Sequence, residues 1–204
     1  MMKLYGGPRS RSRRCAWALT ELGVEFEWLS QDSLGGLKSE AFLALYPAGK
    51  IPVLVDGDRV MAESLAINLY LARRFDNGLW PATDAGRYAA EQWSFWAATE
   101  AEHAAIGLLI ERRLRPEEER RPERAAEHDE TLAPRLKYLD AHLAANNGYL
   151  VEDKFTIADL NVAAVLEGIH AVGVDLAPYP AAKKWYEACI GREALKRTLA
   201  RWKD

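Results

Sequence analysis

Glu63 and Ser64 are the first residues whose types and order could hold one end of a small zwitterion. They stand where a predicted strand passes into a predicted helix. The Ser64 hydroxyl and backbone N–H would meet the positive end of a helix dipole, which favours a carboxylate. The Glu63 carboxylate beside them would suit an α-amino group. The pair therefore predicts a slot for an amino-acid-like ligand end.

The Ile51-Pro52 dipeptide precedes this pair and opens a predicted strand. At the first residue of a strand, the missing N–H of proline costs the sheet least. An X-Pro bond in such a turn is a candidate for the cis isomer. A cis bond would turn the backbone N–H and carbonyl of Ile51 outward. There they could pair with an extended peptide.

Four arginines crowd into one short segment, and they are Arg9, Arg11, Arg13 and Arg14. They stand near the start of a predicted helix, where the helix dipole opposes cations. We expect small anions or acidic partners to compensate for them. For Arg9, Arg11 and Arg13, a solvated surface role and a role in raising the local potential both remain open.

Cys15 and Cys189 are the two cysteines of the chain, and they form no Cys-x-x-Cys pair. Cys15 falls a full turn into a predicted helix, so we expect a buried packing residue rather than a nucleophile. The four histidines are scattered without metal-ligand spacing, and the glycines form no phosphate-binding motif. The sequence therefore predicts no metal site and no nucleotide site.

The elements that must position these residues alternate between strand and helix up to residue 78. The expected strands are 3–5, 24–28, 53–55 and 59–61, and the expected helices are 12–22, 39–45 and 65–75. Asp56-Gly57-Asp58 predicts a tight hairpin turn between the last two strands. The order is βαβαββα, over a predicted domain of residues 1–78.

Strand signals vanish after this, and we expect a linker at 79–84 and an all-helical domain at 85–204. Thr156 and Asp159 form a capping box in which Asp replaces the usual Glu, so a helix should start sharply there. We expect that helix to run to about Val172 and to form the buried centre of its domain. The charged segment 111–130 is expected to be solvated helix ends and a loop.

The composition bounds the class of protein. The chain has 204 residues, 49% of them hydrophobic, with 27 Lys and Arg against 30 Asp and Glu. That length suits one large or two small domains with a real apolar core. The absence of a long apolar run and of a basic excess argues against membrane and nucleic-acid partners. With two cysteines and no signal-like start, a cytoplasmic protein is expected.

Taken in order, these motifs resemble the cytosolic glutathione transferases along essentially the whole chain. The resemblance implies an α/β thioredoxin-like N-terminal domain, an all-α C-terminal domain and glutathione as co-substrate. It also implies that Ile51, next to Pro52, pairs with the cysteinyl backbone of glutathione, and that Glu63 and Ser64 hold its γ-glutamyl end. Lys50, with Lys38 as a helper, would face the glycyl carboxylate, or Lys50 is a plain surface lysine.

The family places the group that activates the glutathione thiol just after the first strand. The family resemblance suggests that Arg14 is structural. When Arg14 and its helix are aligned with the serine-using theta and zeta classes, Ser10 falls at or beside their activating serine. Ser12 is the second candidate. Helix N-capping is the alternative role for each. Tyr5 lies too early for the tyrosine-using classes. The loop lacks the Ser-Ser-Cys run of the zeta class and the cysteine of the beta and omega classes.

The second substrate is expected between the domains. Trp96, Thr99, Glu100 and His103 would share one helix face by their spacing. An aromatic surface beside polar groups suits a small hydrophobic electrophile, and packing is the alternative. The resemblance implies conjugation or isomerisation with glutathione in a homodimer that joins helix 65–75 and helix 88–110. A non-catalytic interaction module and a disulfide reductase or peroxidase are the alternative functions.

Overall fold

The computed structural model describes residues 1–75 and 77–201, which form two compact units. The first unit comprises Met1–Trp80 together with the chain from Arg192 on, and the second comprises Pro81–Gly191. The boundary after Trp80 falls inside the segment 79–84 that the sequence predicts as a linker.

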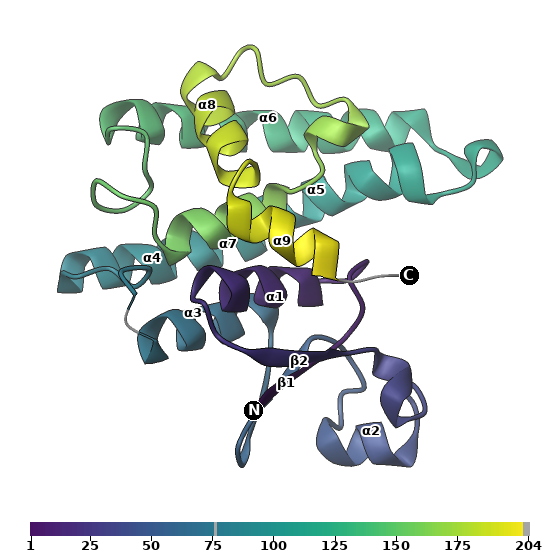
Figure 1. Cartoon of the computed structure of the whole chain (residues 1–204). Helices are drawn as coiled ribbons and strands as arrows, with labels where there is room; N and C mark the ends of the chain where they lie inside the picture. The colour runs from purple at the N-terminus through teal and green to yellow at the C-terminus, as the bar shows by residue number, and fades with distance from the viewer. Residues whose placement is uncertain (76, 202–204) are drawn as a thin grey trace. The chain divides into compact units, whose positions relative to one another are not determined.

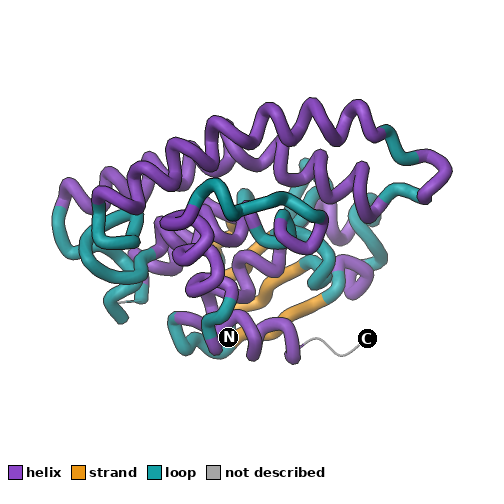
Figure 2. Tube along the Cα trace, turned by 90° about the horizontal axis from the view of Figure 1, so that it is seen from above, coloured by secondary structure: helices purple, strands orange, loops and turns teal. Residues whose placement is uncertain are grey.

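The first unit has the predicted order of elements. They are β1 (Met2–Tyr5), α1 (Ser12–Glu21), β2 (Phe26–Leu29), the 3-10 turn η1 (Gln31–Leu34), α2 (Glu40–Leu45), β3 (Val53–Asp56), β4 (Arg59–Ala62) and α3 (Ser64–Arg74). The strands, orange in Figure 2, form one sheet in the order β2-β1-β3-β4. β1 is parallel to β2 and antiparallel to β3, and β3 and β4 form the expected hairpin. The thioredoxin-like prediction is confirmed.

The core of this unit forms where α2 and the central strands meet. Tyr5 pairs with Leu29 on one side and Val53 on the other. Its ring contacts Phe42 of α2 edge-on, with ring centroids 6.4 Å apart. α1 and α2 lie on opposite sides of the strands (Figure 1). Trp17 of α1 is fully buried, so the helix that follows β1 is anchored firmly.

The last helix, α9 (Glu193–Arg201), differs from the predicted domain of 85–204 because it belongs to the first unit. α9 packs against α1. The Arg192 guanidinium pairs with the Glu21 carboxylate at the end of α1, and the Arg201 guanidinium donates to the Phe26 carbonyl at 2.6 Å. A helical periodicity predicts the helix but not the unit against which it packs.

The second unit is helical, as predicted. Its elements are α4 (Asp84–Trp96), η2 (Ala97–Ala101), α5 (Glu102–Leu109), η3 (Ile110–Leu114), η4 (Glu117–Glu119), α6 (Pro122–Ala145), α7 (Ile157–Leu166), η5 (His170–Val172) and α8 (Pro180–Ile190). η2 and η3 are π-helical turns, and η4 and η5 are 3-10 turns. In the part of the chain that is described, no helix is both long and apolar enough to cross a membrane.

The capping box at the start of α7 is confirmed, and every residue of α7 is buried. The helix ends earlier than the predicted Val172. Glu167 leaves the helical region with ψ 127°, and Gly168 follows with φ +96°. A positive φ is available to glycine without steric conflict. Gly168 was therefore the helix stop that the periodicity did not reveal.

The charged segment 111–130 is less solvated than expected. Glu111 is only 5% exposed. Its carboxylate accepts a hydrogen bond from the Arg121 backbone N–H at 3.2 Å and pairs with Arg115 at 3.0 Å. Burial opposes its charge, but these donors outweigh burial and hold the pKa of Glu111 below its ordinary value. These contacts thus hold the segment together where the helical stretch from α4 to η3 ends.

The Asp159 carboxylate supports a testable prediction about the second unit. It accepts hydrogen bonds from the backbone N–H of Thr156 at 2.8 Å and of Leu150 at 3.0 Å, and from the Trp185 indole at 2.9 Å. Asp159→Ala would leave these buried donors unpaired, at about 1–3 kcal/mol each. We expect the free energy of unfolding in urea to fall by at least about 3 kcal/mol. The exposed Asp153→Ala is the matched control, and equal effects of the two variants would contradict this role.

Candidate functional site

The loop between β1 and α1 is built around Gly6. Gly6 has φ +124°, and a Cβ there would lie 1.9 Å from the Ser12 Oγ and 3.0 Å from the Ile51 Cβ. A side chain at this position is therefore excluded. The close approach brings the start of α1 and the Ile51 turn against the same point of the backbone.

Ser10 and Ser12 have different surroundings in this loop. The Ser10 Oγ is 2.7 Å from the Gly7 carbonyl oxygen and 2.9 Å from the Ser12 Oγ. Its side chain is half-buried, whereas Ser12 is fully buried. The Ser12 hydroxyl donates to the Tyr5 carbonyl at 3.2 Å. Only the Ser10 hydroxyl of the two thus has access to a bound molecule.

Two side chains, one from β2 and one from η1, hold this loop, and no sequence pattern marked them as site residues. The Trp28 indole donates to the Gly6 carbonyl at 2.7 Å. The Gly7 N–H donates to the Gln31 Oε1 at 3.3 Å. The alternation of apolar and charged residues predicted Trp28 only as a strand residue. The Gly6-Gly7 pair, which leaves backbone groups uncovered, was the available signal for such partners.

The Ile51-Pro52 peptide bond is cis, as the sequence suggested. Pro52 is buried and Ile51 is half-buried. Among the described residues, the backbone N–H and carbonyl of Ile51 have no hydrogen-bond partner. An extended peptide segment could therefore pair with both groups without displacing a protein bond.

Glu63 and Ser64 lie at the start of α3, and their backbone is unusual. Glu63 has φ +65° and ψ 106°, and its side chain is exposed. Ser64 is 5% exposed, and its Oγ is 3.5 Å from the Arg14 Nη1. The Cys15 thiol donates to the Ser64 carbonyl at 3.5 Å. The start of α3 is thus fixed to the first turn of α1, close to the loop that carries Ser10.

Lys38 and Lys50 come together at Gly49. Gly49 has φ +59°, and a Cβ there would lie 2.9 Å from the Leu37 carbonyl oxygen and 3.5 Å from the Lys38 Nζ. Lys50 is the next residue, and both lysine side chains are exposed. The Lys38 ammonium group therefore lies at the turn that leads into Ile51, and Lys50 is part of that turn. A carboxylate of a ligand bound along Ile51 would meet positive charge there.

Comparison with known proteins identifies the family. The family models "Glutathione S-transferase, N-terminal domain" and "Glutathione S-transferase, C-terminal domain" match residues 4–78 and 102–193. The chain belongs to the glutathione S-transferase family. It is 38% identical to "Glutathione S-transferase 3" of Zea mays over 213 residues, which cover 98% of this chain and 93% of that protein.

Solved structures of transferases with bound ligands have the same fold. Glutathione S-transferase-I with lactoylglutathione matches with TM-score 0.89 and 28% identity, over 98% of this chain and 99% of the other. A theta class transferase from Xanthomonas axonopodis pv. citri with glutathione bound matches with TM-score 0.88 and 27% identity, over 97% and 96% of the two chains. Glutathione is the co-substrate of this transferase, as the resemblance implied.

Neither Cys15 nor Tyr5 is available to the thiol of glutathione in this transferase. Cys15 is fully buried, and burial, opposed by the nearby Arg14, raises the pKa of its thiol far above the ordinary value. Tyr5 is 7% exposed, and its ring lies in the core against Phe42. A cysteine nucleophile at Cys15 would need a lowered pKa and exposure. Both residues are packing residues.

The residues expected at the electrophile lie on the long helical stretch of the second unit. Trp96, Glu100 and His103 each contact a residue of α6: Trp96 contacts Tyr138 with ring centroids 6.0 Å apart, Glu100 pairs with Arg135 at 3.1 Å, and His103 contacts His128 with centroids 5.4 Å apart. Thr99 instead donates to the Phe95 carbonyl of its own helix at 3.0 Å. Three of the four therefore contact α6, and Thr99, Glu100 and His103 remain exposed.

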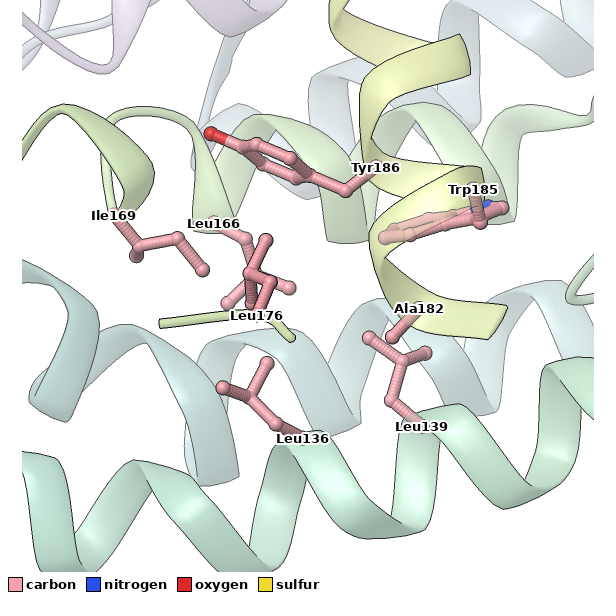
Figure 3. A pocket seen from close by; sticks show the side chains of 8 residues that line it. All are labelled: Leu136, Leu139, Leu166, Ile169, Leu176, Ala182, Trp185 and Tyr186. Carbon is pink, nitrogen blue, oxygen red and sulfur yellow. The ribbon is translucent and has the colours of Figure 1, made fainter. Parts of the chain in front are cut away.

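The pocket in Figure 3 belongs to the packing of the transferase's helical unit. It is lined by Leu136, Leu139, Leu166, Ile169, Leu176, Ala182, Trp185 and Tyr186. These side chains leave no space even for a water molecule. The pocket is therefore a feature of the apolar core and not a substrate site.

The backbone of Glu63 supports a second prediction. A non-glycine residue at such a φ is strained by about 1–3 kcal/mol. Glu63→Gly should relieve this strain and raise the free energy of unfolding in urea by about 1 kcal/mol, after the entropy cost of glycine. Glu63→Ala keeps the Cβ and is the control, because it should give no such gain. A loss of stability in Glu63→Gly would contradict the strain.

Proposed function

We propose that this transferase joins the glutathione thiol to a small hydrophobic electrophile in the cytoplasm, with Ser10 as the hydroxyl that stabilises the thiolate. The single observation that supports it most is the contrast between the two serines of the loop. Ser10 is half-buried beside the first turn of α1, whereas Ser12 is fully buried. An isomerisation that uses the same thiolate fits the same site.

In this proposal, the first unit binds glutathione along its length. The backbone of Ile51, turned outward before Pro52, pairs with the cysteinyl unit. The Glu63 carboxylate holds the α-amino group, and the Ser64 hydroxyl and N–H hold the α-carboxylate at the positive end of α3. Lys50 and Lys38 attract the glycyl carboxylate. The free backbone groups of Ile51 and the lysines around Gly49 support this orientation.

Ser10 then acts on the sulfur. A thiol of ordinary pKa, about 8.5, is mostly protonated at neutral pH. A hydroxyl that donates to sulfur near the N-terminus of α1 favours the thiolate, and the thiol proton leaves to solvent. The sulfur lone pair forms a bond to the electrophilic carbon, and the leaving group departs with its bonding pair. Because Cys15 is buried, disulfide exchange through a protein cysteine has no support, and the intact Ile51 and Glu63 motifs argue against a non-catalytic module.

Trp96 is the residue we propose for apolar contact with the electrophile, with Thr99, Glu100 and His103 as polar neighbours. Trp96 is half-buried, and it belongs to an aromatic cluster with Trp93 and Tyr138. An aromatic surface with polar groups beside it is typical of sites for small organic ligands.

The ligand anchor gives the third prediction. Glu63→Ala combined with Ser64→Ala should abolish measurable glutathione binding, because each change removes a charge-assisted hydrogen bond of roughly 1.5–3 kcal/mol. Isothermal titration calorimetry with glutathione measures the loss, and circular dichroism checks the fold. Glu25→Ala, at an exposed acidic residue before β2, is the control and should bind normally. Retained affinity in the double variant would refute the anchor.

Ser10→Ala gives the fourth prediction and tests the proposed function directly. If Ser10 donates to the thiolate, its loss should raise the pKa of the bound thiol and lower turnover of an aryl halide, with little change in glutathione affinity. Absorbance of the thiolate over a pH series measures the pKa. A serine that only caps α1 would instead cost about 1 kcal/mol of stability and leave the titration unchanged.

We also propose a two-fold homodimer, as the family resemblance implies, in which α3 and the helix over 88–110 meet their copies. Tyr88 and Phe95 support it, because they are 69% and 68% exposed and lie two turns apart on one side of α4. Large exposed aromatic side chains on one helix face are typical of an interface.

The dimer gives the fifth prediction. Sedimentation velocity at micromolar concentration should show the mass of two chains. Phe95→Asp should shift the protein toward one chain, because a carboxylate would be buried without a partner. Leu199→Asp, at a 48% exposed apolar residue on α9, is the matched control and should leave the mass unchanged. A single-chain mass for the unchanged protein would contradict the dimer.

A further inference from the structure

We infer that Ser12 is a positioning residue for the Ser10 hydroxyl and strengthens the hydrogen bond that Ser10 gives to the glutathione thiolate. This inference rests on the proposed function of Ser10. It assigns to Ser12 a role through Ser10 and no contact with glutathione.

The hydrogen bonds around Ser10 require its proton to change partner when sulfur is bound. A hydroxyl has one proton, and the Ser10 Oγ lies within hydrogen-bond distance of two acceptors, the Gly7 carbonyl at 2.7 Å and the Ser12 Oγ at 2.9 Å. When Ser10 donates to the thiolate, it gives neither acceptor a proton. Its oxygen then needs donors of its own, because it lies at a half-buried position.

Ser12 supplies such donors from two atoms. The Ser12 backbone N–H donates to the Ser10 Oγ at 3.2 Å. In the structure the Ser12 hydroxyl donates to the Tyr5 carbonyl at 3.2 Å, but the Ser12 Oγ lies closer to the Ser10 Oγ, at 2.9 Å. Rotation about the Cβ–Oγ bond of Ser12 moves its proton from Tyr5 to Ser10 without moving a heavy atom. Hydrogen bonds in such a chain polarise one another, so Ser10 becomes a stronger donor.

Burial explains why Ser12, and not water, has this role. Ser12 is fully buried, and its Oγ occupies the space that a side chain at Gly6 would need. Water therefore has no room to replace the Ser12 hydroxyl. For the same reason the Ser12 hydroxyl cannot reach a bound ligand, and its effect on the thiol must pass through Ser10.

The test compares Ser12→Ala, Ser10→Ala and the double variant of the full-length protein with glutathione bound. The thiolate absorbance over a pH series gives the pKa of the bound thiol, and calorimetry gives the glutathione affinity. Ser12→Ala should lower the thiolate fraction at neutral pH about two- to four-fold, less than Ser10→Ala does, with the affinity unchanged. In the Ser10→Ala background, Ser12→Ala should have no further effect.

Two further variants provide a control and an alternative to Ser12→Ala. Thr198→Val removes another fully buried hydroxyl of the first unit, which donates to the Ala194 carbonyl at 2.7 Å, and should not move the thiol titration. Ser12→Gly also removes the hydroxyl and adds no atom to the packed site, so it should shift the titration in the same direction if Ser12→Ala does not fold.

The outcomes separate this inference from the proposed function. If Ser10→Ala raises the thiol pKa but neither Ser12 variant does, the role of Ser12 is overturned and the proposed function stands. An undiminished effect of Ser12→Ala in the Ser10→Ala background would also overturn it, because Ser12 would then act without Ser10. If Ser10→Ala leaves the titration unchanged, the proposed function itself fails, and this inference fails with it.

Discussion

The contact between Ser12 and the bare backbone of Gly6 is the constraint on which the site depends. The Ser12 Oγ fills the position of a Gly6 Cβ, so β1, the loop and the first turn of α1 must pack closely. The same point of the backbone lies close to Ile51, which brings the Ile51-Pro52 turn to the loop. A side chain at Gly6 would clash with both Ser12 and Ile51, so these parts could not pack as they do.

The start of α3 joins this centre through α1. Arg14 and Cys15, one turn into α1, contact the hydroxyl and the carbonyl of Ser64. The strained backbone of Glu63 is held by these neighbours, since a sparsely populated conformation persists only where its surroundings fix it. The residues proposed to bind the γ-glutamyl end of glutathione are therefore positioned by one packed group of backbone and buried side chains.

In the helical unit, a buried polar group rather than an apolar one fixes how the elements pack. Asp159 is fully buried, and its carboxylate joins the start of α7 to Leu150 and to Trp185 of α8. Burial raises the pKa of Asp159, while the N–H donors favour its charged form. An apolar core can pack in several ways, whereas a buried carboxylate with several fixed donors requires one arrangement.

The sequence by itself determined the features that rest on local signals. The order of elements to residue 78, the capping box at Thr156, the Ile51-Pro52 turn and the Glu63-Ser64 pair all follow from neighbouring residues. Only the tertiary structure decided the rest. The family resemblance ranked Ser10 before Ser12 without a physical reason, and burial of Ser12 under Gly6 supplies that reason. Trp28 and Gln31 support a loop more than twenty residues away, and α9 packs on α1 from the far end of the chain. Burial and long-range hydrogen bonds depend on which distant residues meet, and periodicity along the chain carries no information about that.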